Sequence, residues 1–254
     1  MSKMKFGKLF AISAGVVLAG CVYFQRDPDL VFHCTFDGDA SIRSPKAGSA
    51  GTIAGATYRE GKIGKALYVP AKSAVATFPF PEGLPTEQGT IEFWGKIEDR
   101  KEVFSHAGDP YMFSFVNSRG GIVFEFHFNS NNGSGKSGII FGLPGGDGCA
   151  SYVGGSRYSA ILGSEDTFGW HHYEVSWNSN GFGGCTCTED NIILIVDGVK
   201  RGGCKSKAIQ SGKLRQMVKG PLTLVFSDPK GGGGIGNSSF SIDEFRVWRK
   251  DRPM

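Results

Sequence analysis

The segment Phe168-Gly169-Trp170-His171-His172-Tyr173-Glu174-Val175-Ser176-Trp177 and its continuation Ile192-Ile193-Leu194-Ile195-Val196-Asp197-Gly198-Val199 decide the fold. In the first half, Tyr173, Val175 and Trp177 alternate with polar residues, which is the period of a strand with one buried face. The second half is an apolar run that stops at Asp-Gly, a pair suited to a tight hairpin turn. The segment therefore predicts two strands and a hairpin, on which the rest of the chain must pack.

Four further motifs, three before this segment and one after it, extend the pattern over residues 30 to 249. They are Phe36-Asp37-Gly38, Gly61-Lys62-Ile63-Gly64-Lys65-Ala66-Leu67-Tyr68-Val69, Gly89-Thr90-Ile91-Glu92-Phe93-Trp94 and Ser241-Ile242-Asp243-Glu244-Phe245-Arg246-Val247-Trp248. With the Trp-His opening and the strand ending in Val-Asp-Gly, the sequence resembles the laminin-G-like jelly rolls of the concanavalin A-like lectin/glucanase superfamily. The resemblance implies an all-β fold, a two-sheet antiparallel β-sandwich spanning residues 30–250. It leaves the function open, because lectins, glycanases and adhesive modules share this architecture.

Length and composition fit one β-sandwich domain and give no reason to expect nucleic acid as a partner. The chain has 254 residues, of which 39 are Gly, a content that suits many turns. Its formal charge is +4, and three of the lysines lie within the first 21 residues. Without that segment the charge is about +1, too small to attract a polyanion.

Residues 1–21 have the features of a bacterial lipoprotein signal. A basic start precedes a short apolar run and the sequence Leu18-Ala19-Gly20-Cys21. This tetrapeptide resembles a lipobox, which implies that Cys21 is lipidated and that residues 22–29 form a short linker. Residue 22 is Val rather than Asp, which by the same resemblance favours the outer membrane of a Gram-negative bacterium. The alternative is an ordinary signal peptide with a chance Cys.

Export places the remaining cysteines, Cys34, Cys149, Cys185, Cys187 and Cys204, in an oxidising compartment. The Asp-Gly turn directs the strand holding Cys204 back towards the loop holding Cys185 and Cys187. We therefore expect a disulfide between Cys204 and one of these two, with the other pairing with Cys149. Cys34 is then left as a buried core thiol. A zinc site is not expected, because the Cys-Thr-Cys spacing is too tight.

Polar and aromatic residues on the non-core faces of three predicted strands are the candidate ligand-binding set. If these strands are neighbours in one sheet, an aromatic ring lies beside carboxylates and imidazoles, a combination that suits a sugar. The alternative for the aromatic member is a core position on a strand buried on both faces. The residues are Trp94, Glu125, His127, His172 and Glu174.

The sequence offers no recognisable catalytic constellation, so we expect a protein without enzymatic activity. A retaining glycosidase needs two carboxyl groups about 5–5.5 Å apart, and no single strand provides that spacing. The pair His171-His172 suggests a metal or a general base, but a packed or hydrogen-bonded histidine is the favoured interpretation. We therefore expect an exported, membrane-anchored domain that recognises a glycan or a protein of the cell envelope. The alternatives are a polysaccharide-acting glycoside hydrolase and a structural subunit of an envelope assembly.

The last predicted strand contains a second informative pattern. Its apolar residues change from even positions (Phe240, Ile242) to odd ones (Phe245, Val247), which predicts a β-bulge near Asp243. The first and last strands of jelly rolls commonly pair, which would bring Asp37 close to Asp243. The resemblance implies a structural calcium ion at that point. The alternative is that both aspartates only bond neighbouring backbone.

Overall fold

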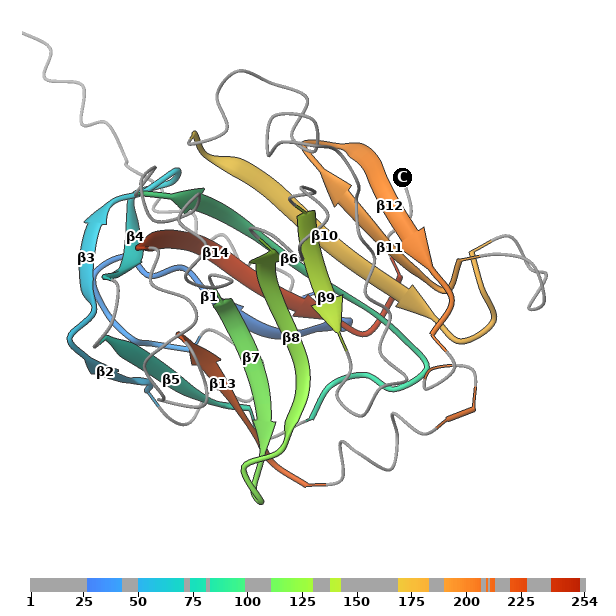
Figure 1. Cartoon of the computed structure of the whole chain (residues 1–254). Helices are drawn as coiled ribbons and strands as arrows, with labels where there is room; N and C mark the ends of the chain where they lie inside the picture. Colours follow the sequence, from blue (N-terminus) through green and yellow to red (C-terminus); the bar gives the residue numbers. More distant parts are fainter. Residues whose placement is uncertain are drawn as a thin grey trace, which may run out of the picture.

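The chain forms a sandwich of two antiparallel sheets, as predicted (Figure 1). The computed structural model describes residues 27–42, 50–70, 74–80, 83–98, 111–129, 138–142, 169–182, 190–206, 209, 211–212, 220–227 and 239–251. Among these residues, no helix has the length and apolar character needed to cross a membrane.

The larger sheet has eight strands in the order β12-β11-β10-β6-β14-β4-β3, and β1 also pairs with β14. The smaller sheet has the order β2-β5-β13-β7-β8-β9. The strands are β1 (Leu30–Cys34), β2 (Thr52–Ala54), β3 (Thr57–Glu60), β4 (Lys65–Val69), β5 (Val75–Phe80), β6 (Gln88–Ile97), β7 (Tyr111–Asn117), β8 (Ile122–Asn129), β9 (Gly138–Gly142), β10 (His171–Asn178), β11 (Ile192–Val196), β12 (Val199–Cys204), β13 (Leu222–Phe226) and β14 (Phe240–Trp248).

The segment that opened the sequence analysis forms β10, β11 and β12 at one side of the larger sheet. Tyr173, Val175 and Trp177 are buried, which confirms the predicted alternation. The turn between β11 and β12 contains Asp197 and Gly198 at φ 51° and 75°. Positive φ at both positions is the signature of the tight hairpin turns that favour Asp-Gly, so the hairpin prediction is confirmed.

The bulge predicted in β14 is also present. Asp243 of β14 pairs with Trp94 of β6, and Arg246 pairs with Glu92. Between these pairs β14 has one residue more than β6. Glu244 takes up the difference with φ 50°. The bulge directs Phe245 into the core, because it changes the side of the sheet to which the following side chains point.

Phenylalanine supplies most of the largest fully buried side chains between the sheets. Phe93 of β6 stacks on Tyr173 at 5.2 Å between ring centroids and meets Phe113 and Phe126 edge-on at 5.3 and 5.1 Å. Burying each such side chain stabilises the fold by about 1.5–3 kcal/mol, and the ring pairs add about 0.5–1.5 kcal/mol. This core fixes the two sheets, so the outer faces are available for other roles.

Candidate functional site

Two of the predicted ligand residues, Trp94 and His172, lie side by side on the outer face of the larger sheet. His172 of β10 is directly opposite Trp94 of β6, and their ring centroids are 5.1 Å apart. Both side chains are half-buried, so part of each ring is accessible. The exposed Lys62 completes the cluster, with its Nζ 4.6 Å from the centroid of the Trp94 ring. We call these three residues the Trp94 surface.

Lys62 was missed in the sequence analysis because it lies in the turn between β3 and β4. This turn is close to Trp94 of β6 because β4 and β6 both pair with β14, and no local sequence pattern predicts that strand order. The turn is held by two carboxylates. The backbone N–H of Ile63 donates to Asp243 Oδ2 at 2.8 Å, and the N–H of Lys65 donates to Asp37 Oδ1 at 3.1 Å. Asp243 is thus a positioning residue for the cation above the tryptophan ring.

Asp243 carries the clearest electrostatic perturbation on this face of the molecule. Its side chain is completely buried, and Oδ1 has no hydrogen-bond partner among the described residues. Burial raises the pKa of Asp243 to about 6; the hydrogen bond from Ile63 opposes this shift and the nearby Glu244 carboxylate reinforces it. A charged carboxylate here therefore destabilises the fold unless a cation compensates it.

The carboxylates next to the Trp94 surface are engaged in the protein's own interactions. Glu92 Oε1 accepts a hydrogen bond from Arg246 at 3.3 Å, and Arg246 also pairs with Glu244. Glu174, another predicted ligand residue, is directly opposite Glu92 and accepts a hydrogen bond from Ser176 at 3.1 Å. Glu92 and Glu174 are both buried, so they offer little surface to a ligand.

Glu125 and His127 belong to a strand of the other sheet. They lie on β8, which belongs to the six-stranded sheet, whereas β6 and β10 belong to the eight-stranded one. The outer faces of two stacked sheets point in opposite directions, so Glu125 on the outer side of β8 is turned away from Trp94. A single surface was expected only if the three strands are neighbours in one sheet, and β8 does not meet that condition.

His171 has a structural role, in agreement with the favoured interpretation. Its ring is buried, and Nδ1 lies 2.6 Å from Asp197 Oδ2. The other oxygen of Asp197 accepts a hydrogen bond from the backbone N–H of His172 at 2.9 Å. The Trp-His opening and the Asp-Gly turn thus stabilise each other across the sheet.

The cysteine predictions are tested only at Cys34. Its side chain is buried, as expected, and the thiol donates to the carbonyl of Ser41 at 3.3 Å. Cys21 of the lipobox, with all of residues 1–26, and Cys149, Cys185 and Cys187 lie outside the described residues. Cys204 is placed only as a backbone position of β12, so the disulfide and the lipid anchor stay predictions.

The predicted meeting of the first and last strands is confirmed. β1 pairs with β14, and Asp37 and Asp243 contact the same turn. Within the described ranges no group of three or more His, Cys, Asp or Glu side chains is arranged to hold a metal. The buried, unpaired oxygen of Asp243 nevertheless suits a hard cation, so calcium stays a prediction.

No protein-family model matches the chain, and no curated protein matches it by sequence. Solved structures do match over 89% of the chain. Domain 4 of AbnA, a GH43 extracellular arabinanase from Geobacillus stearothermophilus solved in complex with arabinotriose, is 16% identical with a TM-score of 0.58 and is covered over 94% of its length. The binding domain of botulinum neurotoxin serotype C1 is 13% identical with a TM-score of 0.60 and is covered over 50%.

The ligand-binding domain of botulinum neurotoxin serotype D, solved in complex with N-acetylneuraminic acid, is 12% identical with a TM-score of 0.57 and is covered over 48%. The chain therefore spans about half the length of the neurotoxin domains that it matches. At these identities the likeness establishes the β-sandwich fold and nothing further.

Proposed function

We propose that this chain is an exported, lipid-anchored, non-catalytic recognition domain that binds a glycan at the cell envelope through the Trp94 surface. The observation that carries the proposal is the partly accessible Trp94 ring, with His172 beside it and Lys62 above it. An aromatic ring stacks on the C–H face of a sugar, and adjacent polar groups bond its hydroxyls.

Lys62 determines how a ligand would enter. Its ammonium group occupies the face of Trp94 that a sugar ring would use. The side chain is exposed and flexible, so it is able to leave the ring and donate hydrogen bonds to the ligand. The arabinotriose and N-acetylneuraminic acid complexes of two structural neighbours support a glycan as the class of ligand.

One observation favours the alternative of a glycoside hydrolase. Glu92 and Glu174 face each other across β6 and β10, and directly opposed residues have Cβ atoms about 4.5–5.5 Å apart. Their burial and their bonds to Arg246 and Ser176 argue for a structural role instead. The enzyme would be established if the unaltered chain releases reducing ends from a polysaccharide and both Glu92→Gln and Glu174→Gln lose this activity.

The envelope-assembly alternative has less support from the described surface. Large exposed apolar side chains there are Ile63, in the turn next to β3, and Val199, at the start of β12. β3 and β12 are the two ends of the larger sheet, so these residues do not form a patch. We therefore propose a glycan rather than a protein as the main partner. The proposed lipid anchor is at Cys21, and the proposed location of the protein is the outer membrane.

A structural calcium ion is part of the proposal. Asp243 Oδ1, buried without a partner among the described atoms, and the Asp37 carboxylate at the same turn would supply two of the six to eight oxygens that calcium needs. Backbone carbonyls and water would supply the others. A bound ion would neutralise Asp243 and fix the turn that carries Lys62.

The test is a glycan-array screen of the full chain, repeated with Trp94→Ala. Loss of a central stacking tryptophan should weaken binding by about 2 kcal/mol, or about thirtyfold. Tyr68→Ala is a matched control, because Tyr68 is an aromatic residue of β4 on the same sheet. A cation also lies over its ring, with Arg59 Cζ 3.2 Å from the ring centroid. The proposal fails if no glycan is retained, or if Trp94→Ala binds as tightly as the unaltered chain.

A further inference from the structure

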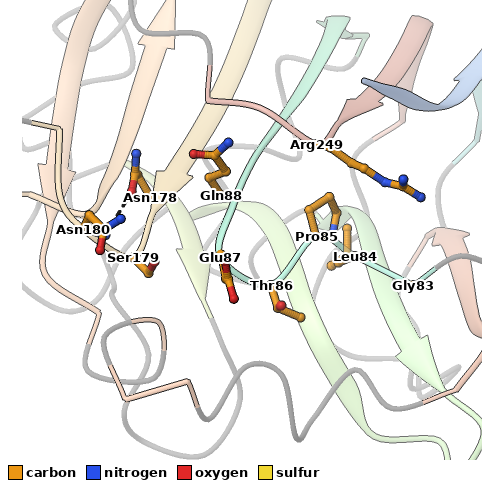
Figure 2. A pocket seen from close by; sticks show the side chains of 10 residues that line it. All are labelled: Gly83, Leu84, Pro85, Thr86, Glu87, Gln88, Asn178, Ser179, Asn180 and Arg249. Carbon is orange, nitrogen blue, oxygen red and sulfur yellow. Dashed lines mark hydrogen bonds between the residues drawn. The ribbon is translucent and has the colours of Figure 1, made fainter. Parts of the chain in front are cut away.

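A cavity of about 470 Å³ lies at the end of β6 and β10 opposite the Trp94 surface. Residues 83–88, residues 178–180 and Arg249 line it. Figure 2 shows residues 178–180 at one end, Arg249 above Pro85 and Leu84 at the other, and Gln88 and Glu87 between them. The volume falls within the range of small-ligand pockets.

The cavity is separate from the Trp94 surface. Gln88 and Trp94 are six residues apart on β6, which corresponds to about 20 Å along a strand. Between them Thr90 is completely buried and donates a hydrogen bond to the carbonyl of Lys250 at 2.9 Å. Lys250 therefore lies beside β6 between the two places, and at this separation one ligand group does not reach both.

The walls of the cavity are fixed by the fold itself. The Trp177 indole N–H donates to the Pro85 carbonyl at 3.0 Å, and the Ser179 N–H donates to the Glu87 carbonyl at 2.7 Å. The Asn178 carboxamide donates to Asp251 at 2.7 Å and accepts from the backbone N–H of Asn180 at 2.9 Å. These bonds join three distant segments, so the backbone of the walls needs little further ordering when a ligand binds.

The polar groups that line the cavity are mainly uncharged. The carboxamides of Gln88 and Asn180 and the hydroxyls of Thr86 and Ser179 each combine a donor with an acceptor. Glu87 and Arg249 bring one charge of each sign, so the lining has no net charge. An apolar ligand is disfavoured because it would strand these groups, whereas a hydroxyl group satisfies both donor and acceptor.

We infer that this cavity is a second ligand site, which takes a neutral, hydroxyl-rich ligand such as the end of an uncharged oligosaccharide. Leu84 and Pro85 provide an apolar wall for the C–H groups of the ligand, and Gln88 and Asn180 provide its hydrogen bonds. The inference does not depend on the Trp94 surface, because the two places share no residue.

The experiment uses the full chain labelled with ¹⁵N and follows the side-chain NH₂ signals of Gln88, Asn178 and Asn180. The probes are neutral trisaccharides of glucose, mannose, galactose, xylose and arabinose, with trigalacturonic acid as the charged comparison. At least one neutral trisaccharide should shift the Gln88 and Asn180 signals in a saturable way. Gln88→Ala should weaken the binding of that trisaccharide about threefold to tenfold, the effect of one lost hydrogen bond. Gln88 is exposed, so this variant keeps the fold.

The two proposals fail independently in this experiment. Trp94→Ala should leave the cavity shifts unchanged, and loss of the shifts in that variant would overturn the second site. The inference is also overturned if no neutral trisaccharide shifts these signals, if Gln88→Ala binds as the unaltered chain does, or if trigalacturonic acid alone binds. None of these results bears on glycan retention by the Trp94 surface.

Discussion

Replacing Asp243 by Asn should stabilise the protein at neutral pH in the presence of a chelator. The buried carboxylate has its pKa raised from 3.8 to about 6. Asn resembles the protonated form in shape and still accepts the hydrogen bond from Ile63. Each pKa unit corresponds to 1.36 kcal/mol, so the ionised carboxylate costs about 3 kcal/mol at pH 7, which Asn avoids. For a domain of this size the gain raises the midpoint of thermal unfolding by about 6–12 °C.

The pH dependence provides a second measurement. Because the folded state holds the Asp243 proton more tightly than the unfolded state, its contribution is full below pH 3.8 and is lost as the pH rises through about 6. The free energy of unfolding of the unaltered chain should therefore contain a fall of about 3 kcal/mol across this window, and Asp243→Asn should lack it. Urea unfolding monitored by tryptophan fluorescence between pH 3.5 and 7.5, with EDTA, measures both.

Asp37→Asn is the matched control, because Asp37 bonds the same turn from an exposed position. It should change stability by less than about 0.5 kcal/mol in EDTA. Destabilisation of Asp243→Asn in EDTA at pH 7, or a persisting fall between pH 4 and 6, would refute the cost assigned to the ionised Asp243 carboxylate. With millimolar calcium, the proposed ion should stabilise the unaltered chain and neither Asn variant. Equal midpoints with calcium and with EDTA would eliminate the ion.

Three further experiments, two with substituted chains and one with the unaltered chain, test other predictions. Cys21→Ser should remove the acyl mass and release the protein from the membrane fraction; unchanged fractionation would contradict the lipobox. Non-reducing peptide mapping should recover Cys204 linked to Cys185 or Cys187, a bond that contributes on the order of 3 kcal/mol, and free thiols at all three would exclude it. Phe93→Ala should lower the free energy of unfolding by about 3–5 kcal/mol, because Phe93 is completely buried between the sheets. A loss below 1 kcal/mol would contradict the packing described for the core.

The features that could be predicted from the sequence are those that depend on a few consecutive residues. The alternation in β10, the Asp197-Gly198 turn and the bulge in β14 all follow from which side of a strand each side chain occupies. That property is set by the local backbone, so the residue pattern reports it directly. The pairing of the first and last strands was taken from the resemblance and is present as well.

The composition of the site depended on which strands become neighbours, and no local pattern encodes this. Trp94 and His172 meet because β6 pairs with β10, although 78 positions separate them, whereas Glu125 is in the other sheet. Lys62 reaches Trp94 because Asp243 holds its turn. Strand order minimises the free energy of the whole core, to which every buried side chain contributes. The sequence alone therefore determined the strands and their buried faces, and the tertiary structure decided which polar residues from distant strands come together.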